Sequence, residues 1–235
     1  MAAAARGDYK LTDYEDRAAR YGSDVRLYLP GYGAMFDMAA ALLSSRAPGD
    51  CNLLVVAAGG GEEFCAFGSR FPGWKMTGVD PSPAMLAVAR QRVEEMGIGD
   101  RVETLCGTAG DLPEGKVFDA ATCMFVMGMI QDDGSKLAFL REVAKRLKRG
   151  APLLLADAVG DVGSEAFGRI MADVAAHGIS GGMQEDEMDK FRSQVGRLPI
   201  VTEAREMELM EQAGFAVEYQ YFRALIFSAW IAYKK

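Results

Sequence analysis

An α/β fold with a mostly parallel, doubly wound sheet is predicted by three features of the sequence. The first is the mainly apolar stretch 51–56, which has no helical period and is typical of a strand buried on both faces. The second is the glycine triplet Gly59 to Gly61, directly before a short helical segment. The third is Asp80, which ends a second apolar stretch nineteen residues after Gly61. Strand, glycine turn and helix together form the opening unit of nucleotide-binding domains, in which the ligand lies over the helix N-terminus.

The other elements follow in chain order and complete a Rossmann-like, seven-stranded sheet that closes with an antiparallel C-terminal hairpin. Strands are expected at 51–56, 75–80, 101–106, 117–125 and 152–158, with the hairpin at 215–221 and 224–233. Helices are expected at 11–21, 35–44, 62–70, 83–96, 135–148, 165–177, 184–195 and 202–213, with a flexible hinge at 178–182.

Two regions are predicted along the chain. Residues 1–48 form an N-terminal helical cover, of which 1–10 are loose. Residues 49–235 form the Rossmann-like domain, with a helical insert at 160–200 after the fifth strand. The basic side chains at the C-terminal end of the helix at 135–148 interact favourably with the helix dipole. We interpret this end as solvated rather than as a nucleic-acid site.

Composition places the chain among globular proteins of the cytoplasm. Half of its 235 residues are apolar and a quarter are charged, and no apolar run approaches the length that spans a bilayer. The start of the chain lacks the pattern of a signal peptide. The four cysteines have no paired spacing, so we expect reduced thiols and no metal site. The net charge of −7 gives no general attraction to nucleic acid.

The glycine turn indicates a ligand without phosphate. A dinucleotide motif would need a third glycine where Phe64 stands, and no Lys-Ser/Thr pair follows as in a P-loop. Glu62 and Glu63 begin the next helix, where they would repel phosphate and tolerate a cation such as the sulfonium of S-adenosylmethionine (SAM). Asp80 is placed to accept the ribose hydroxyls of an adenosine, although it could instead only cap the helix that follows.

The segment Val79 to Leu86, the strand before it and the order of the elements resemble class I SAM-dependent methyltransferases over residues 50–160. Within that class the chain is most similar to the carboxy-SAM synthase family. That likeness extends to 29–32 (Leu-Pro-Gly-Tyr), 190–193 (Lys-Phe-Arg-Ser) and 212–215 (Gln-Ala-Gly-Phe). The resemblance implies SAM as cofactor, S-adenosylhomocysteine as product, and an N-terminal segment that covers the cofactor.

The expected cofactor site combines the glycine turn, the acid at 80 with the start of its helix, and the ends of the third and fourth strands. Tyr32 lies between glycines and is expected to approach the ligand. The resemblance to carboxy-SAM synthases adds Arg192, which there would hold the added carboxylate, from the same or a neighbouring subunit. The full set is Tyr32, Ala57, Ala58, Gly59, Gly61, Asp80, Pro81, Met85, Thr108, Ala109, Phe125 and Arg192.

Three positions depart from the pattern of these families. Val55 stands where the class has an acid that orders the glycine loop and helps to position the methionine moiety. Ala57 replaces the opening glycine, which we expect to be a mild change. Phe125 stands where carboxy-SAM synthases have asparagine.

Three functions are left open by the sequence. The first is methyl transfer from SAM to a small, largely apolar acceptor; the second is a carboxy-SAM synthase-like reaction of SAM with prephenate; the third is binding of SAM or S-adenosylhomocysteine without catalysis. His177 and Asp157 are candidate general bases, and neither is assigned, so the catalytic residues are unknown. We expect a small-molecule substrate, no nucleic acid and no membrane, and a homodimer is left open.

Overall fold

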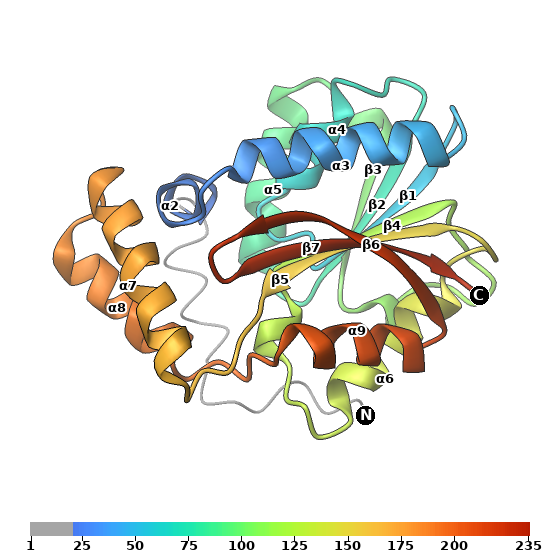
Figure 1. The fold of residues 1–235 in the computed structure, drawn as a ribbon. Helices are drawn as coiled ribbons and strands as arrows, with labels where there is room; N and C mark the ends of the chain where they lie inside the picture. The colour runs from blue at the N-terminus through green and yellow to red at the C-terminus, as the bar shows by residue number, and fades with distance from the viewer. Residues whose placement is uncertain (1–20) are drawn as a thin grey trace.

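The computed structural model describes residues 21–235, and these residues form a single seven-stranded sheet (Figure 1). The strand order is β3-β2-β1-β4-β5-β7-β6, and the strands are parallel except for β7, which runs antiparallel to both neighbours. This arrangement confirms the predicted fold class. The strands are β1 (Asn52–Val56), β2 (Lys75–Asp80), β3 (Val102–Cys106), β4 (Ala120–Met124), β5 (Pro152–Ala158), β6 (Phe215–Ala224) and β7 (Phe227–Lys234).

Helices cover both faces of the sheet because its central strands are apolar on both sides. In β1, Leu53 and Val55 pack into one core cluster, and Leu54 and Val56 pack into the other. Helices α3 (Tyr32–Arg46), α4 (Glu62–Gly68) and α5 (Pro83–Glu95) lie over one face (Figure 1). Helices α6 (Ser135–Lys145) and α9 (Glu203–Gln212) lie over the opposite face. Short 3-10 turns η1 (Gly99–Arg101), η2 (Ala109–Asp111) and η3 (Met127–Met129) complete the connections.

The insert and the described N-terminal residues lie together at one end of the sheet. Helices α2 (Tyr21–Tyr28), α7 (Glu165–Ser180) and α8 (Glu185–Val195) lie beyond the C-terminal end of β5, the strand that precedes α7 (Figure 1). The rings of Tyr28 and Phe191 stack with centroids 4.1 Å apart, which joins α2 to α8. The helix predicted at 11–21 lies outside the described residues except for its last residue, and α2 was not predicted.

The flexible hinge predicted at 178–182 is wrong in its first residues, since α7 continues through Gly178 to Ser180. Gly178 is buried, and a Cβ atom there would lie only 2.3 Å from Cε of Met188 on α8. The glycine therefore allows α7 and α8 to pack closely. It does not provide a pivot between them.

The fourth strand is shorter than predicted. β4 begins at Ala120, because Phe118 leaves the main ladder and forms an isolated bridge with Leu147. The strand ends before Phe125, whose backbone turns to a φ of 58° while its N–H still donates to the carbonyl of Ala156 at 2.7 Å. This turn directs the chain away from the sheet at the edge where the candidate site lies.

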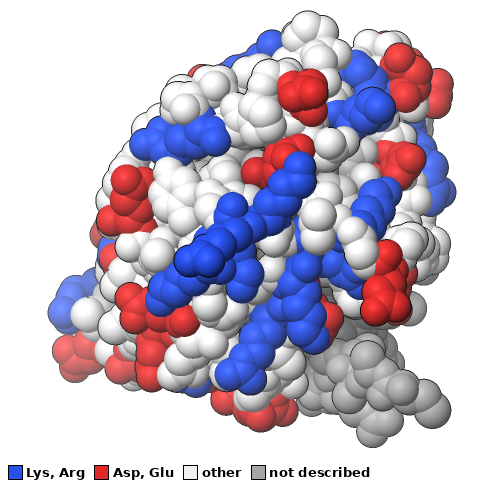
Figure 2. Space-filling model, turned by 90° about the vertical axis from the view of Figure 1, so that its right-hand side faces the viewer, with Lys and Arg blue, Asp and Glu red and all other residues white. Residues whose placement is uncertain are grey.

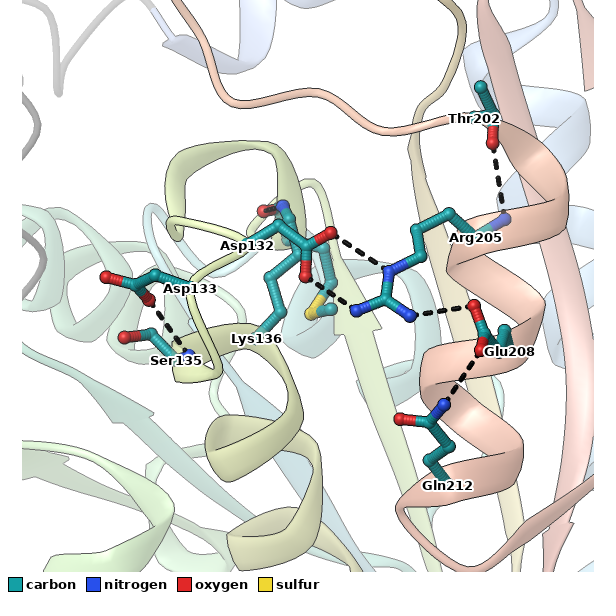
Figure 3. A network of polar contacts seen from close by, with 9 residues as sticks. Asp132, Asp133, Ser135, Lys136, Thr202, Arg205, Glu208 and Gln212 are labelled. Atoms are coloured by element: carbon teal, nitrogen blue, oxygen red, sulfur yellow. Dashed lines mark hydrogen bonds and ion pairs between the residues drawn. The ribbon is translucent and has the colours of Figure 1, made fainter.

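A polar network fastens α9 to the turn before α6 (Figure 3). The guanidinium of Arg205 donates to both oxygens of Asp132, at 2.9 and 3.1 Å, and to Glu208 at 2.7 Å. The hydroxyl of Thr202 accepts the backbone N–H of Arg205 at 3.3 Å and so caps the start of α9, the helix predicted at 202–213. Next to this network, Lys136 is fully buried and donates to the carbonyl of Met127. The network therefore couples the helices of the second face to each other.

No helix within residues 21–235 is long and apolar enough to cross a membrane.

Candidate cofactor site

The candidate site lies at the C-terminal ends of the parallel strands, around β1, β2 and β4. The strand order reverses between β1 and β4, since β2 and β3 extend to one side and β5 to the other. Ligands of open α/β sheets bind in the crevice at such a reversal. Most of the predicted site residues come from the turns that follow these three strands.

Asp80, the last residue of β2, links two of these turns. One carboxylate oxygen accepts the N–H of Gly59 at 2.8 Å, and the other accepts the N–H of Ser82 at 2.8 Å. Burial raises the pKa of Asp80, and the two backbone N–H groups oppose that rise. Each oxygen retains a second lone pair, so the anchored carboxylate can still accept hydroxyl groups of a ribose. The cap of α5 is instead Ser82, whose hydroxyl accepts the N–H of Met85 at 3.3 Å.

The glycine turn brings α4 against α5. Gly61 has a φ of 80°, and a Cβ atom there would lie 3.1 Å from the backbone of Ala89 on α5. Gly59, with a φ of 47°, approaches Cε of Met85 in the same way, at 3.2 Å. The turn is therefore held closed from one side by α5 and from the other by Asp80.

Ala57 also has a left-handed backbone, with a φ of 56°. An L-residue with a Cβ atom is strained in this region by about 1–2 kcal/mol, which explains why the class has glycine at this position. The expectation that Ala57 is a mild change is therefore wrong for the backbone. Val55, in contrast, is fully buried in the core cluster below α3 and α4, where it replaces an acid by apolar packing.

The first turn of α4 is acidic and is enclosed by cations. Glu62 accepts from Arg26 at 2.9 Å and from Arg92 at 2.6 Å, and Arg92 also donates to the carbonyl of Gly60 at 2.9 Å. Arg26 and Arg92 lie 36 and 30 residues from Glu62 in the sequence, so no local pattern identified them as its partners. This ion-pair group fixes the helix that follows the glycine turn.

Glu63, the next residue, is in a different electrostatic state. Its side chain is 4% exposed, and within the described residues its Oε1 atom has no hydrogen-bond partner. Burial raises the pKa of Glu63 to about 8, with a further rise from the charges of Glu62 and Asp80. The hydroxyl of Tyr221 on β6 is likewise buried without a partner among the described residues. Burial and the charge of Glu63 both raise the pKa of Tyr221.

Aromatic side chains form one wall beside the acidic groups. Tyr32, the first residue of α3, is 3% exposed, and its ring lies 6.2 Å from that of Phe125 and 5.0 Å from that of Phe36. Phe125 also meets Phe227 edge to face at 6.1 Å. Burial raises the pKa of Tyr32, as do the charges of Glu62 and Glu63. The structure therefore brings Tyr32 and Phe125 together, as the sequence predicts for two parts of one site.

The loop after β3 is fixed by Arg146. Its guanidinium donates to the carbonyls of Ala109, Gly110, Leu112 and Pro113, at distances of 2.7 to 3.0 Å. The interpretation of this helix end as solvated is therefore wrong for Arg146. Thr108 is exposed, and its hydroxyl and backbone N–H both donate to Asp111 at 2.8 Å. Ala109 is buried against the second face of the sheet.

The other basic side chains at this end of the helix do differ from Arg146. Lys145 and Lys148 are exposed and pair with Glu142 and Asp119. Figure 2 shows the side of the molecule where the C-terminus lies, with bands of Lys and Arg interrupted by Asp and Glu. Because charges of both signs are mixed on this face, it is not a uniform basic surface.

Several predicted residues are not part of the cluster around Asp80 and Glu63. Arg192 lies on α8 with a 44% exposed side chain, and its ion pair within the described residues is with Asp189 on the same helix, at 3.8 Å. His177 is exposed on α7. Asp157 is buried at the end of β5 and accepts the N–H groups of Gly128 at 3.0 Å and Ala158 at 2.7 Å. These bonds give Asp157 a structural role in holding η3, and burial raises its pKa to about 6.

Two other predicted residues lie next to Asp80, at the start of the helix that follows it. Pro81 is exposed there, and Met85 is buried.

Sequence comparison identifies a domain of known type within the chain. Residues 53–150 match the family model described as a methyltransferase domain. Isonocardicin synthase from Nocardia uniformis subsp. tsuyamanensis is 33% identical over 90 residues, which are 38% of this chain and 28% of that protein. The chain therefore corresponds to only a small part of that relative.

Structural comparison extends the likeness to almost the whole chain. The mitomycin 7-O-methyltransferase MmcR has a TM-score of 0.64 and 19% identity, with 97% of this chain and 62% of that chain covered. The cyclase SpnF has a TM-score of 0.61 and 18% identity, with 84% of this chain and 81% of that chain covered. At such identities the likeness shows the fold, and the chain spans less than two thirds of the length of the mitomycin enzyme. Strand order, glycine turn and structural comparison agree: the chain has the fold of class I SAM-dependent methyltransferases, and residues 53–150 match the methyltransferase domain model.

Proposed function

We propose that this chain is a SAM-dependent methyltransferase that acts on a small molecule. The observation that supports this most directly is Asp80, a buried carboxylate anchored by two backbone N–H groups with acceptor capacity left for a ribose.

The residues present fit SAM, which when bound would supply an electrophilic methyl group on its sulfonium. Asp80 would hold the ribose, and the loop pinned by Arg146 would border the adenine. Tyr32 and Phe125 would exclude water from one side of the reacting centre. Alignment of the acceptor and exclusion of water supply most of the acceleration that methyl transfer needs.

A small acceptor is favoured by the elements at the ligand edge. Helices α2, α7 and α8 lie at this end and enclose a core that includes Met171, Met183 and Met188. Methionine adapts to irregular apolar shapes, which suits a pocket for a small molecule. The mitomycin enzyme with a similar fold is named for a small-molecule acceptor. The cyclase shows that the fold alone does not determine the reaction.

The test begins with the nucleoside that copurifies with the protein, identified by mass spectrometry. We expect SAM or S-adenosylhomocysteine; a mass increased by one carboxyl group would instead favour the carboxy-SAM synthase-like reaction with prephenate. Calorimetry should then show binding of SAM in preference to NAD, and the opposite preference would contradict the proposal.

Transfer is tested with SAM labelled on its methyl group, offered separately with a small-metabolite extract, bulk tRNA and bulk protein. We expect label in the small-molecule fraction. Label in macromolecules alone would contradict the choice of acceptor, and binding without any transfer would favour a non-catalytic binding protein.

A further inference from the structure

Two buried polar atoms, one of them in the helix that follows the glycine turn, lack hydrogen-bond partners within residues 21–235. They are Oε1 of Glu63 on α4 and the hydroxyl of Tyr221 on β6. The charge of Glu63 affects the pKa of Tyr221 and also that of Tyr32, so the three side chains share one electrostatic environment. A buried polar group without a partner is unfavourable by about 1–3 kcal/mol, so native structures retain such groups where a partner is supplied in another way.

The neighbouring carboxylates have their partners already. Glu62 is held by Arg26 and Arg92, and Asp80 accepts two backbone N–H groups. Glu63 is different, because the cations beside it are directed to Glu62. Its position is thus suited to a ligand that brings both a positive charge and an N–H donor.

We propose that Glu63 binds the ammonium group of the methionine part of SAM. This proposal rests on the proposed function. It also accounts for Val55, since the acid that the class has at this position of the first strand is absent here and Glu63 lies in the first turn of the helix that follows the strand. The carboxylate that positions the methionine part of SAM would thus come from the first turn of α4 and not from the first strand.

The ammonium fits Glu63 better than the sulfonium does. An ammonium has three N–H donors and can form a charge-assisted hydrogen bond to Oε1. A sulfonium has no such donor and would leave Oε1 without a hydrogen bond. The ammonium is present in both SAM and S-adenosylhomocysteine, whereas 5′-methylthioadenosine retains the adenosine and thioether but lacks the ammonium. Comparison of these three ligands therefore shows whether Glu63 binds the ammonium or the sulfonium.

The experiment is titration calorimetry of the full chain with these three ligands. For Glu63→Gln we expect a loss of about 10- to 100-fold in affinity for SAM and S-adenosylhomocysteine, and a change within twofold for 5′-methylthioadenosine. Asp80→Ala should weaken all three ligands. Glu103→Gln, an exposed acid on β3, is the matched control and should weaken none.

A second measurement uses the wild-type protein alone. Glu63 has a pKa of about 8 without ligand, so it is largely protonated at pH 7 and must release its proton when it pairs with a cation. Binding heats in two buffers of different ionisation enthalpy should show this release for SAM and not for 5′-methylthioadenosine. Glu63→Gln should abolish it. This measurement remains informative even if the variant folds poorly.

The outcomes are distinct. Equal losses for all three ligands, or unchanged affinity for SAM, would overturn the ammonium contact, and so would a loss confined to SAM, which would assign Glu63 to the sulfonium. If the wild-type chain binds none of the three ligands, the proposed function itself fails.

Discussion

Ala57 shows how one side chain can strain the turn on which a site depends. Phe125 has a similar φ of 58°, and each of the two residues directly follows a strand at the candidate site. Strained backbone persists where the surrounding structure holds it, and it gathers at ligand sites. Two of the three non-glycine residues with a left-handed backbone among the described residues lie in the turns that border the candidate site; the third, Leu225, lies in the hairpin between β6 and β7.

Ala57→Gly should stabilise the protein by about 0.5–1 kcal/mol, because relief of the left-handed strain exceeds the added entropy of the unfolded chain. The measurement is urea unfolding. Ala58→Gly is the control: Ala58 is 2% exposed, and its φ is not among the positive values, so glycine there should destabilise by about 1 kcal/mol. Equal losses in both variants would show that Ala57 is not strained in solution.

Asp80→Ala should weaken SAM binding by about 30- to 150-fold, which corresponds to the loss of charge-assisted hydrogen bonds of roughly 2–3 kcal/mol. Part of this loss arises from the glycine turn, because the carboxylate also orients the N–H of Gly59. Calorimetry gives the affinity, and thermal unfolding shows whether the variant remains folded. An unchanged affinity would remove Asp80 from the site.

At the scale of elements, Arg146 connects α6 to the loop that follows β3. Four carbonyls of this loop depend on a single guanidinium, and a lysine could not reach them together because it has one nitrogen. Such a connection sets the position of one edge of the site from the opposite face of the sheet.

Arg146→Ala should lower the free energy of unfolding by about 2 kcal/mol and weaken SAM binding several-fold, since the loop loses its support. Arg149→Ala, at an exposed residue just beyond the same helix, should change stability by less than about 0.5 kcal/mol. Urea unfolding and calorimetry measure the two effects. The idea fails if both variants behave alike.

The elements themselves follow closely from the sequence, whereas many contacts do not. Strand and helix positions depend on local apolar periodicity and on helix-start signals such as Thr202, and they were predicted within a few residues. The role of Gly178 was misjudged because its packing partner Met188 belongs to another helix. The partners of Glu62 and the contacts of Arg146 are also distant in sequence, so local patterns contain no signal for them. The sequence therefore predicts which turns meet at this edge of the sheet, whereas the charges around them required the fold.

At the scale of the whole molecule, buried acids make stability depend on pH. The pKa values of Glu63 and Asp157 are raised by burial to about 8 and about 6, from ordinary values of 4.5 and 3.8. At a pH between the ordinary and the raised pKa of such a group, the folded protein therefore binds more protons than the unfolded chain. Stability contributed by the protonated groups is complete below the ordinary pKa and is lost as pH rises through the raised pKa.

The ligand-free protein should thus lose on the order of 4 kcal/mol of stability or more between pH 5.5 and pH 8.5, since Glu63 alone titrates across about 2.5 pH units of this window at about 1.4 kcal/mol each. Urea unfolding at both pH values measures the loss. Glu63→Gln should show a smaller loss because one of the three acids within residues 21–235 whose pKa is raised to about 6 or about 8, which are Glu63, Asp157 and Glu206, no longer titrates. Glu103→Gln should behave as the wild type, because Lys116 lowers the pKa of this exposed acid and it stays ionised throughout the window. A stability that rises with pH over this window would contradict the assignment.

The position of β7 also has a consequence for biosynthesis. β7 follows β6 in the chain, yet it lies between β5 and β6 in the sheet. While the chain emerges from the ribosome, β5 has an unpaired edge and β6 has no neighbour to join, until the residues of β7 are released. Unpaired strand edges of apolar sequence attract other chains. The sheet of this protein is therefore completed only after translation has passed Phe227–Lys234, and a nascent chain stalled before that point would be the species that chaperones must protect.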